Sequence, residues 1–168
     1  MADADAPLVL PRPAVRVAVV MERETAPNRW EDWRFCIAEV VSHEDEFGLE
    51  ARVLRDDGRL QTTLHPGFTL ELFRDQAEGY WLNLSSGSPV WFVVWRIDDA
   101  DPSRAWPETV SLSYTEAGRW LDAQERVDNV PLPPDLAAWL QAYADAYYEP
   151  EQKKRRRPQS FVPPGERR

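Results

Sequence analysis

The chain has 168 residues, a net charge of −9, eight tryptophans and one cysteine. A chain of this length can bury a stable core without disulfides, and its single cysteine excludes an intrachain disulfide. The segment Met1–Pro7 lacks the apolar run of a signal peptide, and the longest apolar run, Val90–Trp95, is too short to span a bilayer. These features predict a cytoplasmic protein without membrane contact.

Charge is distributed unevenly along the chain. Residues 149–168 contain seven basic and three acidic residues, a net charge of +4, so the remaining residues carry −13. An acidic body makes nucleic acid an unlikely partner for the folded part. The most conspicuous local feature is a basic run whose members are Lys153, Lys154, Arg155, Arg156 and Arg157. It predicts a solvated tail, a docking element for an acidic partner or RNA, or a segment bound to the chain's own acidic body.

The first half of the chain is predicted to form strands. Residues 1–13 alternate Asp with Ala and then carry three prolines, which predicts a disordered lead. Residues 14–149 are expected to form one β-rich domain, and residues 150–168 a basic disordered tail. Alternating apolar residues predict strands over 15–22, 33–41, 50–55 and 60–64.

The centre of the chain, residues 65–98, is predicted to be a meander of three strands. Pro66-Gly67 predicts a turn before a strand over 68–73, and the polar residues 74–79 predict a hairpin loop. A second strand is expected over 80–84. Residues 90–97 are apolar on both faces, which is typical of a central strand.

Two helices are predicted to close the domain. After a loop over 98–107 and a strand over 109–114, Thr115 is the expected N-cap of a helix that ends near Arg126. A proline-rich break follows, and Pro134 begins a second helix with one apolar stripe. The fold class is therefore α+β, a mainly antiparallel β barrel or sandwich of about seven strands followed by two C-terminal helices.

Few residues suggest chemistry. Cys36, His43 and His65 lie on separate segments without metal-ligand spacing, and no glycine-rich nucleotide loop is present. We therefore predict no catalytic residue, no metal and no cofactor. The candidate partner-binding residues are the basic run and Trp81, Trp91 and Trp95, which form either core packing or an exposed aromatic patch.

Several stretches carry a family resemblance. They are residues 65–96, residues 110–157, VMERE near the N-terminus and RWEDWRF after it. The most specific combination is EAGRWLDAQERVDNVPLPP followed by a basic run after a Tyr-Tyr helix end. Over about residues 14–158 the chain resembles the bacterial domain-of-unknown-function family 3305. Members of that family occur near formate dehydrogenase genes, and the family offers no catalytic residues to transfer.

The resemblance implies a non-catalytic accessory protein that assists assembly or maturation of a molybdenum-dependent formate dehydrogenase, with a subunit of that enzyme as its partner. The alternative is a small-molecule binder or enzyme that handles the pterin cofactor in a β-barrel interior. A third hypothesis is RNA binding through the basic run. A closed, fully packed core without a pocket of ligand size, roughly 300 Å³ or more, would count against the alternative.

Overall fold

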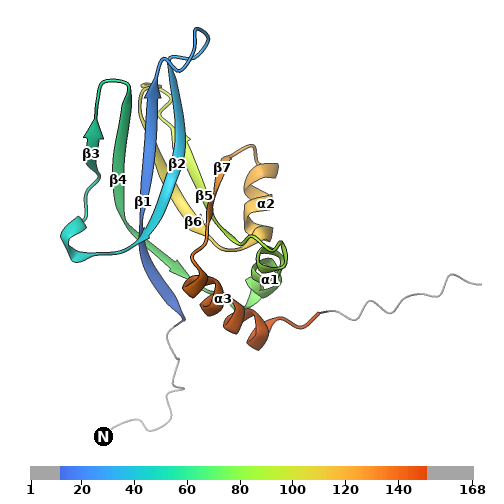
Figure 1. Ribbon diagram of the computed structural model, residues 1–168. Helices are drawn as coiled ribbons and strands as arrows, with labels where there is room; N and C mark the ends of the chain where they lie inside the picture. The colour runs from blue at the N-terminus through green and yellow to red at the C-terminus, as the bar shows by residue number, and fades with distance from the viewer. Residues whose placement is uncertain (1–11, 151–168) are drawn as a thin grey trace, which may run out of the picture.

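A computed structural model describes residues 12–150, which form two antiparallel sheets and three α-helices. One sheet has the strand order β2-β1-β4-β3 and the other β6-β5-β7. The helices gather together on one side of the molecule, away from the tip of the β1–β2 hairpin (Figure 1). The elements are β1 Ala14–Thr25, β2 Trp33–Ser42, β3 Arg52–Asp56, β4 Leu60–Glu71, α1 Ala77–Ser85, β5 Val90–Ile97, β6 Ala105–Ser111, α2 Tyr114–Asp122, β7 Arg126–Pro131 and α3 Pro134–Tyr147.

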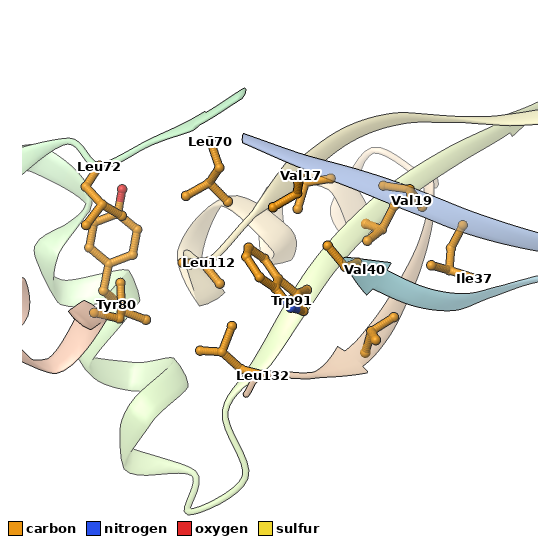
Figure 2. Packing of buried hydrophobic residues seen from close by; sticks show 14 of the residues in the cluster. Val17, Val19, Ile37, Val40, Leu70, Leu72, Tyr80, Trp91, Leu112 and Leu132 are labelled. Atoms are coloured by element: carbon orange, nitrogen blue, oxygen red, sulfur yellow. The ribbon is translucent and has the colours of Figure 1, made fainter. Parts of the chain in front are cut away.

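The main core lies between the two sheets. Alternate residues of β1, including Val17 and Val19, turn their side chains toward Trp91 and Val93 of β5. Figure 2 shows Trp91 close to Val17, with Leu132 on its other side. The α+β class and the antiparallel pairing are thus confirmed. Because the described strands pair as two separate sheets, they fit a sandwich-like arrangement and do not close into one barrel.

The prediction of β5 as a central strand is confirmed. It pairs with β6 on one side and β7 on the other. Five consecutive residues from Trp91 to Trp95 are buried, because one face meets the other sheet and the second face meets α2. On that second face, the Phe92 ring packs edge-on against Tyr114 of α2, with 6.4 Å between the ring centroids.

The turn predicted at Pro66-Gly67 is wrong. Residues 60–71 form one strand, β4, in which Pro66 and Gly67 together oppose the single residue Ala18 of β1. This arrangement is a β-bulge, and Gly67 takes the positive φ of +92° that the bulge requires. The dipeptide therefore kinks a continuous strand where the sequence suggested a break between two strands.

The strand predicted over 80–84 and the loop before it are also wrong. A short 3-10 helix, Arg74–Gln76, leads into α1. Buried contacts explain the helix: the Asn83 side-chain amide N–H donates to the Val90 and Leu112 carbonyls at 2.9 and 3.0 Å. The Asn83 side-chain oxygen accepts the Val90 amide N–H at 3.0 Å. These bonds hold α1 against the start of β5. They favour the helix more than the alternation of apolar residues favours a strand.

The C-terminal third of the described chain differs in its boundaries and in one missed strand. The N-cap of α2 is Ser113, whose Oγ accepts the Glu116 amide N–H, and Thr115 lies inside the helix. Residues 126–131, predicted as a helix end and a proline-rich break, form β7 and pair with β5. The predicted pair of C-terminal helices is therefore divided by a strand, whereas α3 begins at Pro134 as predicted.

Two predictions fall largely or wholly outside the described residues. The lead over 1–13 and the tail over 150–168 share only Arg12, Pro13 and Pro150 with the described range. Within residues 12–150, every helix is too short or too polar to cross a bilayer.

Candidate functional site

The three candidate tryptophans lie in different environments. Trp91 is 1% exposed in the core, and Trp95 is 8% exposed with its indole N–H donating to Asp128. Neither ring has an exposed face for a partner, so the three residues do not form one aromatic patch. Trp81, on α1, is 40% exposed. Partner binding stays a prediction for Trp81 alone among the three.

Trp81 belongs to a group of aromatic side chains from three segments. Its ring stacks on Tyr148, just after α3, with 5.0 Å between centroids and 25° between the ring planes. Tyr147 is 41% exposed and packs against Tyr143 one helical turn earlier. Phe73, between β4 and the 3-10 helix, is also exposed. We call this group the aromatic surface; it consists of Phe73, Trp81, Tyr143, Tyr147 and Tyr148.

Two arginines lie over the rings of the aromatic surface. The Arg74 guanidinium is 4.6 Å from the centre of the Tyr147 ring, and that of Arg12 is 4.8 Å from the Phe73 ring. Cation–π contacts of this kind stabilise the ring orientations. The aromatic surface therefore has a cationic component.

A buried tyrosine supports the aromatic surface from below. Tyr80 is 2% exposed and packs edge-on against Tyr143, with 5.9 Å between centroids. Its hydroxyl accepts the Phe73 amide N–H at 3.0 Å, which fixes the segment that carries Phe73 and Arg74. Burial raises the pKa of Tyr80 to about 12, so the phenol stays neutral at physiological pH. Packing of Tyr80 on Tyr143 thus connects the aromatic surface to the core.

A hollow of about 440 Å³ adjoins the aromatic surface. It is lined by Arg74, Asp75, Ala77, Glu78, Tyr147, Tyr148 and Glu149. One cation and three carboxylates surround the two tyrosine rings. Exposed Tyr rings beside an arginine are typical of protein-binding hot spots, whereas carboxylates are depleted there.

A second candidate site is a cleft between the two sheets, with a volume of about 390 Å³. It is lined by Met21, Glu22, Arg23, Phe35, Ala51, Val53, Gln61, Thr63, His65, Ser103, Arg104, Ala105 and Trp106. We call it the intersheet cleft. Its volume lies within the range of small-ligand sites, roughly 300–1,000 Å³.

The candidate metal ligands and nucleophile of the sequence, Cys36, His43 and His65, do not form a common site in the structure. Cys36 is exposed on β2, and its thiol contacts the Glu22 carboxylate at 3.7 Å. Desolvation and, secondarily, the Glu22 charge raise the pKa of Cys36 to about 11, so it is a thiol at neutral pH. Burial lowers the pKa of His65. Among residues 12–150, no three His, Cys, Asp or Glu side chains are grouped so that they could hold a metal ion.

The basic run, residues 153–157, lies outside the described residues, so its role stays a prediction. Sequence reasoning missed Phe73, Tyr147 and Tyr148 as surface residues. Helical spacing assigns Tyr147 to the apolar stripe of α3, although the two consecutive tyrosines at the helix end could have marked an exposed position. Nothing local in the sequence pointed to the intersheet cleft, because its lining comes from five strands and two loops.

The described residues define an α+β protein with two facing antiparallel sheets, an aromatic surface and an intersheet cleft. A family model described as "Protein of unknown function (DUF3305)" matches residues 16–157. The match covers most of the chain, and the chain therefore belongs to this family. No curated protein and no solved structure matches the chain.

Proposed function

We propose that the protein is a non-catalytic binding protein that assists assembly or maturation of a molybdenum-dependent formate dehydrogenase. The aromatic surface would make the contact, and the partner would be a subunit of that enzyme. The observation that carries the binding role is the Trp81–Tyr148 stack beside the exposed Tyr147 ring. The identity of the partner rests on the sequence resemblance alone.

Preorganisation favours this surface as the binding site. Binding costs less entropy when side chains already hold one geometry. Trp81 is held by Tyr148, and Tyr147 lies between Tyr143 and the Arg74 guanidinium. Trp, Tyr and Arg are also the residue types most enriched among binding hot spots. The aromatic surface can thus bury large rings without first having to order them.

A role for the basic run follows from charge. The run begins five residues after Tyr148, so it is covalently close to the aromatic surface. Clustered cations accelerate encounter with an acidic partner at low salt more than they tighten the final complex. We therefore propose that residues 153–157 steer a cytoplasmic partner toward the aromatic surface.

Affinity purification tests the proposal. Tagged full-length protein would be recovered from its own host during growth on formate, and the associated proteins identified by mass spectrometry. We expect a formate dehydrogenase subunit with the wild type and its loss with a Trp81→Ala/Tyr147→Ala double variant. Trp30→Ala is the matched control, because Trp30 is 84% exposed in the β1–β2 loop, outside the aromatic surface.

Two outcomes would contradict the proposal. One is failure of the wild type to enrich any formate dehydrogenase subunit. The other is equal recovery with Trp30→Ala and the double variant, which would locate binding elsewhere. Circular dichroism of each variant separates lost binding from lost folding. A chain truncated after Pro150 tests the basic run, for which we expect slower association that depends less on salt.

The intersheet cleft favours a second candidate function, small-ligand binding. Its volume of about 390 Å³ is sufficient for a small organic molecule. The resemblance suggests the pterin cofactor as the ligand. Because the described strands form two separate sheets, the proposed site is the intersheet cleft and not a barrel interior. Mass spectrometry of small molecules released from the purified protein would test this: a recovered pterin supports it, and its absence from protein purified under native conditions opposes it.

A further inference from the structure

The intersheet cleft contains two arginines that lie far apart in the sequence. Arg23 comes from β1, and Arg104 from the loop just before β6. Arg23 is on the face of β1 that meets the other sheet, because it alternates with Met21 of the core cluster. One terminal guanidinium nitrogen of Arg23 donates to the Ser103 carbonyl at 3.0 Å. This bond holds the Arg23 head group at the wall of the cleft, next to Arg104.

Arg23 has hydrogen-bonding capacity to spare. Its Nε is buried and has no acceptor among residues 12–150. Within the same residues, neither Arg23 nor Arg104 has a carboxylate within the 4.0 Å of an ion pair, although the chain is acidic overall. Apart from the bond to the Ser103 carbonyl, no acceptor is found within the described range for the terminal N–H groups of Arg23, and these are the donors that a bound oxyanion would satisfy.

Two carboxylates, those of Glu22 and Asp101, lie near the two arginines. The pKa of Asp101, on the adjacent loop, is held low first by hydrogen bonds from Ser103 and further by the charges of Arg104 and Arg23. Glu22 also lines the cleft, but it is a single negative charge and its carboxylate contacts the Cys36 thiol. Among the lining residues two cations face one carboxylate, and Asp101 is a further carboxylate on the adjacent loop.

Uncharged groups complete the lining. Burial lowers the pKa of His65, so its imidazole is neutral at pH 7 and offers one N–H donor and one acceptor. Gln61 and Thr63 of β4 add further donors. Phe35 lies opposite Arg23 in the β1–β2 pairing, on the inner face, and with Met21 it gives the cleft an apolar wall as well as the cationic one.

We propose that the intersheet cleft binds a small organic anion, whose carboxylate or phosphate contacts Arg23 and Arg104 and whose apolar body packs on Phe35 and Met21. This inference deepens the second candidate function, since it names the ligand class, and it is independent of the partner proposed for the aromatic surface. Guanidinium groups match the planar geometry of these oxyanions. The mixed lining disfavours ligands that are wholly polar or uncharged.

NMR titration of the full-length protein tests the ligand class with four probes. Benzoate and phenyl phosphate each combine an oxyanion with an apolar ring. Benzamide has the shape of benzoate without its charge, and inorganic phosphate has the charge without a ring. We expect benzoate or phenyl phosphate to shift the Trp106 indole and His65 imidazole signals, and we expect at least about tenfold weaker binding for the two control probes.

Variants locate the binding. Arg104→Gln removes an exposed cation without disturbing the core and should weaken the better probe about tenfold. Arg23→Lys keeps a cation but loses the guanidinium fork and should also weaken it. Arg16→Gln is the matched control, an exposed arginine of β1 outside the cleft lining, and should bind as the wild type does.

Three results would overturn the inference. The first is that all four probes leave the Trp106 and His65 signals unchanged at about 10 mM, which would nearly saturate a site of millimolar affinity. The second is equal binding of benzamide and benzoate together with equal binding of inorganic and phenyl phosphate. The third is an unchanged affinity of the Arg104→Gln variant. Equal binding of benzamide would overturn the anion preference but would still support small-ligand binding in the cleft. Failure to recover a formate dehydrogenase subunit in the affinity purification would not bear on the anion site.

Discussion

The Asp128 carboxylate on β7 connects the two sheets through the Ile37 amide on β2. Its Oδ1 accepts the Trp95 indole N–H at 3.1 Å, and its Oδ2 accepts the Ile37 amide N–H of β2 at 2.9 Å. Because β2 is the outer strand of one sheet and β7 that of the other, this carboxylate bridges their edges. Charged acceptors make stronger hydrogen bonds than neutral ones.

The bridge should contribute measurably to stability. We expect Asp128→Ala to lower the free energy of unfolding by about 2 to 3 kcal/mol, because it leaves two partly buried N–H groups without an acceptor. Urea unfolding followed by tryptophan fluorescence measures the loss. Asp99→Ala, an exposed aspartate in the β5–β6 loop, is the control and should change stability by less than about 0.5 kcal/mol. Similar midpoints for the two variants would show that the bridge adds little.

Asn83 is the polar residue on which the helical conformation of residues 77–85 depends. It is 1% exposed and satisfies both backbone groups of Val90 and the carbonyl of Leu112. Asn83→Leu keeps the branched shape, removes all three bonds and adds some volume, so we expect a loss of about 3 to 5 kcal/mol in urea unfolding. Asn129→Leu, at an exposed position of β7, should cost less than about 0.5 kcal/mol. A loss below about 1 kcal/mol for Asn83→Leu would refute this assignment.

Gly79 allows α1 to approach the N-terminus of α2. A Cβ at this position would overlap the Ser113 Oγ and lie 3.1 Å from the Thr115 Oγ1. We expect Gly79→Ala to destabilise the protein by about 1 to 3 kcal/mol, and Ser113→Ala to cost less in the Gly79→Ala background than in the wild type. Gly118→Ala, in α2 with open space around it, should stabilise by about 0.5 to 1 kcal/mol. Thermal unfolding that ranks the two glycine variants in the opposite order would contradict the proposed packing.

Cys36 should react slowly in spite of its exposure. Its pKa is raised to about 11, so its thiolate fraction between pH 7 and 9 is far below that of an ordinary thiol. The rate of alkylation by iodoacetamide should rise about tenfold per pH unit over this range without levelling. Glu22→Gln removes a negative charge beside the sulfur and should increase the rate at pH 8. A rate that levels near pH 9 would refute the shift, and Glu39→Gln on the exposed part of β2 serves as the control.

The sequence predicted elements whose signals are strong and local. Strand β5 was predictable because its residues are apolar on both faces, and α3 because Pro134 precedes a long apolar stripe. Helix α1 was not, because Tyr80, Leu82 and Leu84 alternate as in a strand and the residues before them have the polar composition of a hairpin loop. Its conformation is set by contacts of Asn83 with residues up to 29 positions away. Local preference is too weak to decide so short a segment.

The candidate sites were less predictable than the fold. Trp81 was identified from residue type alone, but the same reasoning selected Trp91 and Trp95, which are buried. Whether a tryptophan is exposed depends on which face of its element meets the other sheet. The contact between Arg23 and the Ser103 carbonyl joins residues 80 positions apart. Such a pair is brought together only by the packing of the two sheets, and no local pattern marks it.

The bulge at Pro66-Gly67 has a consequence for how copies of the chain behave when concentrated. Strand β3 pairs with β4 only as far as Leu64, so the rest of β4 has no described strand on that side. If such an unpaired edge were long and flat, it would invite strand addition by a second molecule and eventual aggregation. Pro66 has no amide N–H to offer, and the bulge twists the edge at that point. We therefore expect this kink to help keep neighbouring molecules apart in a crowded cell.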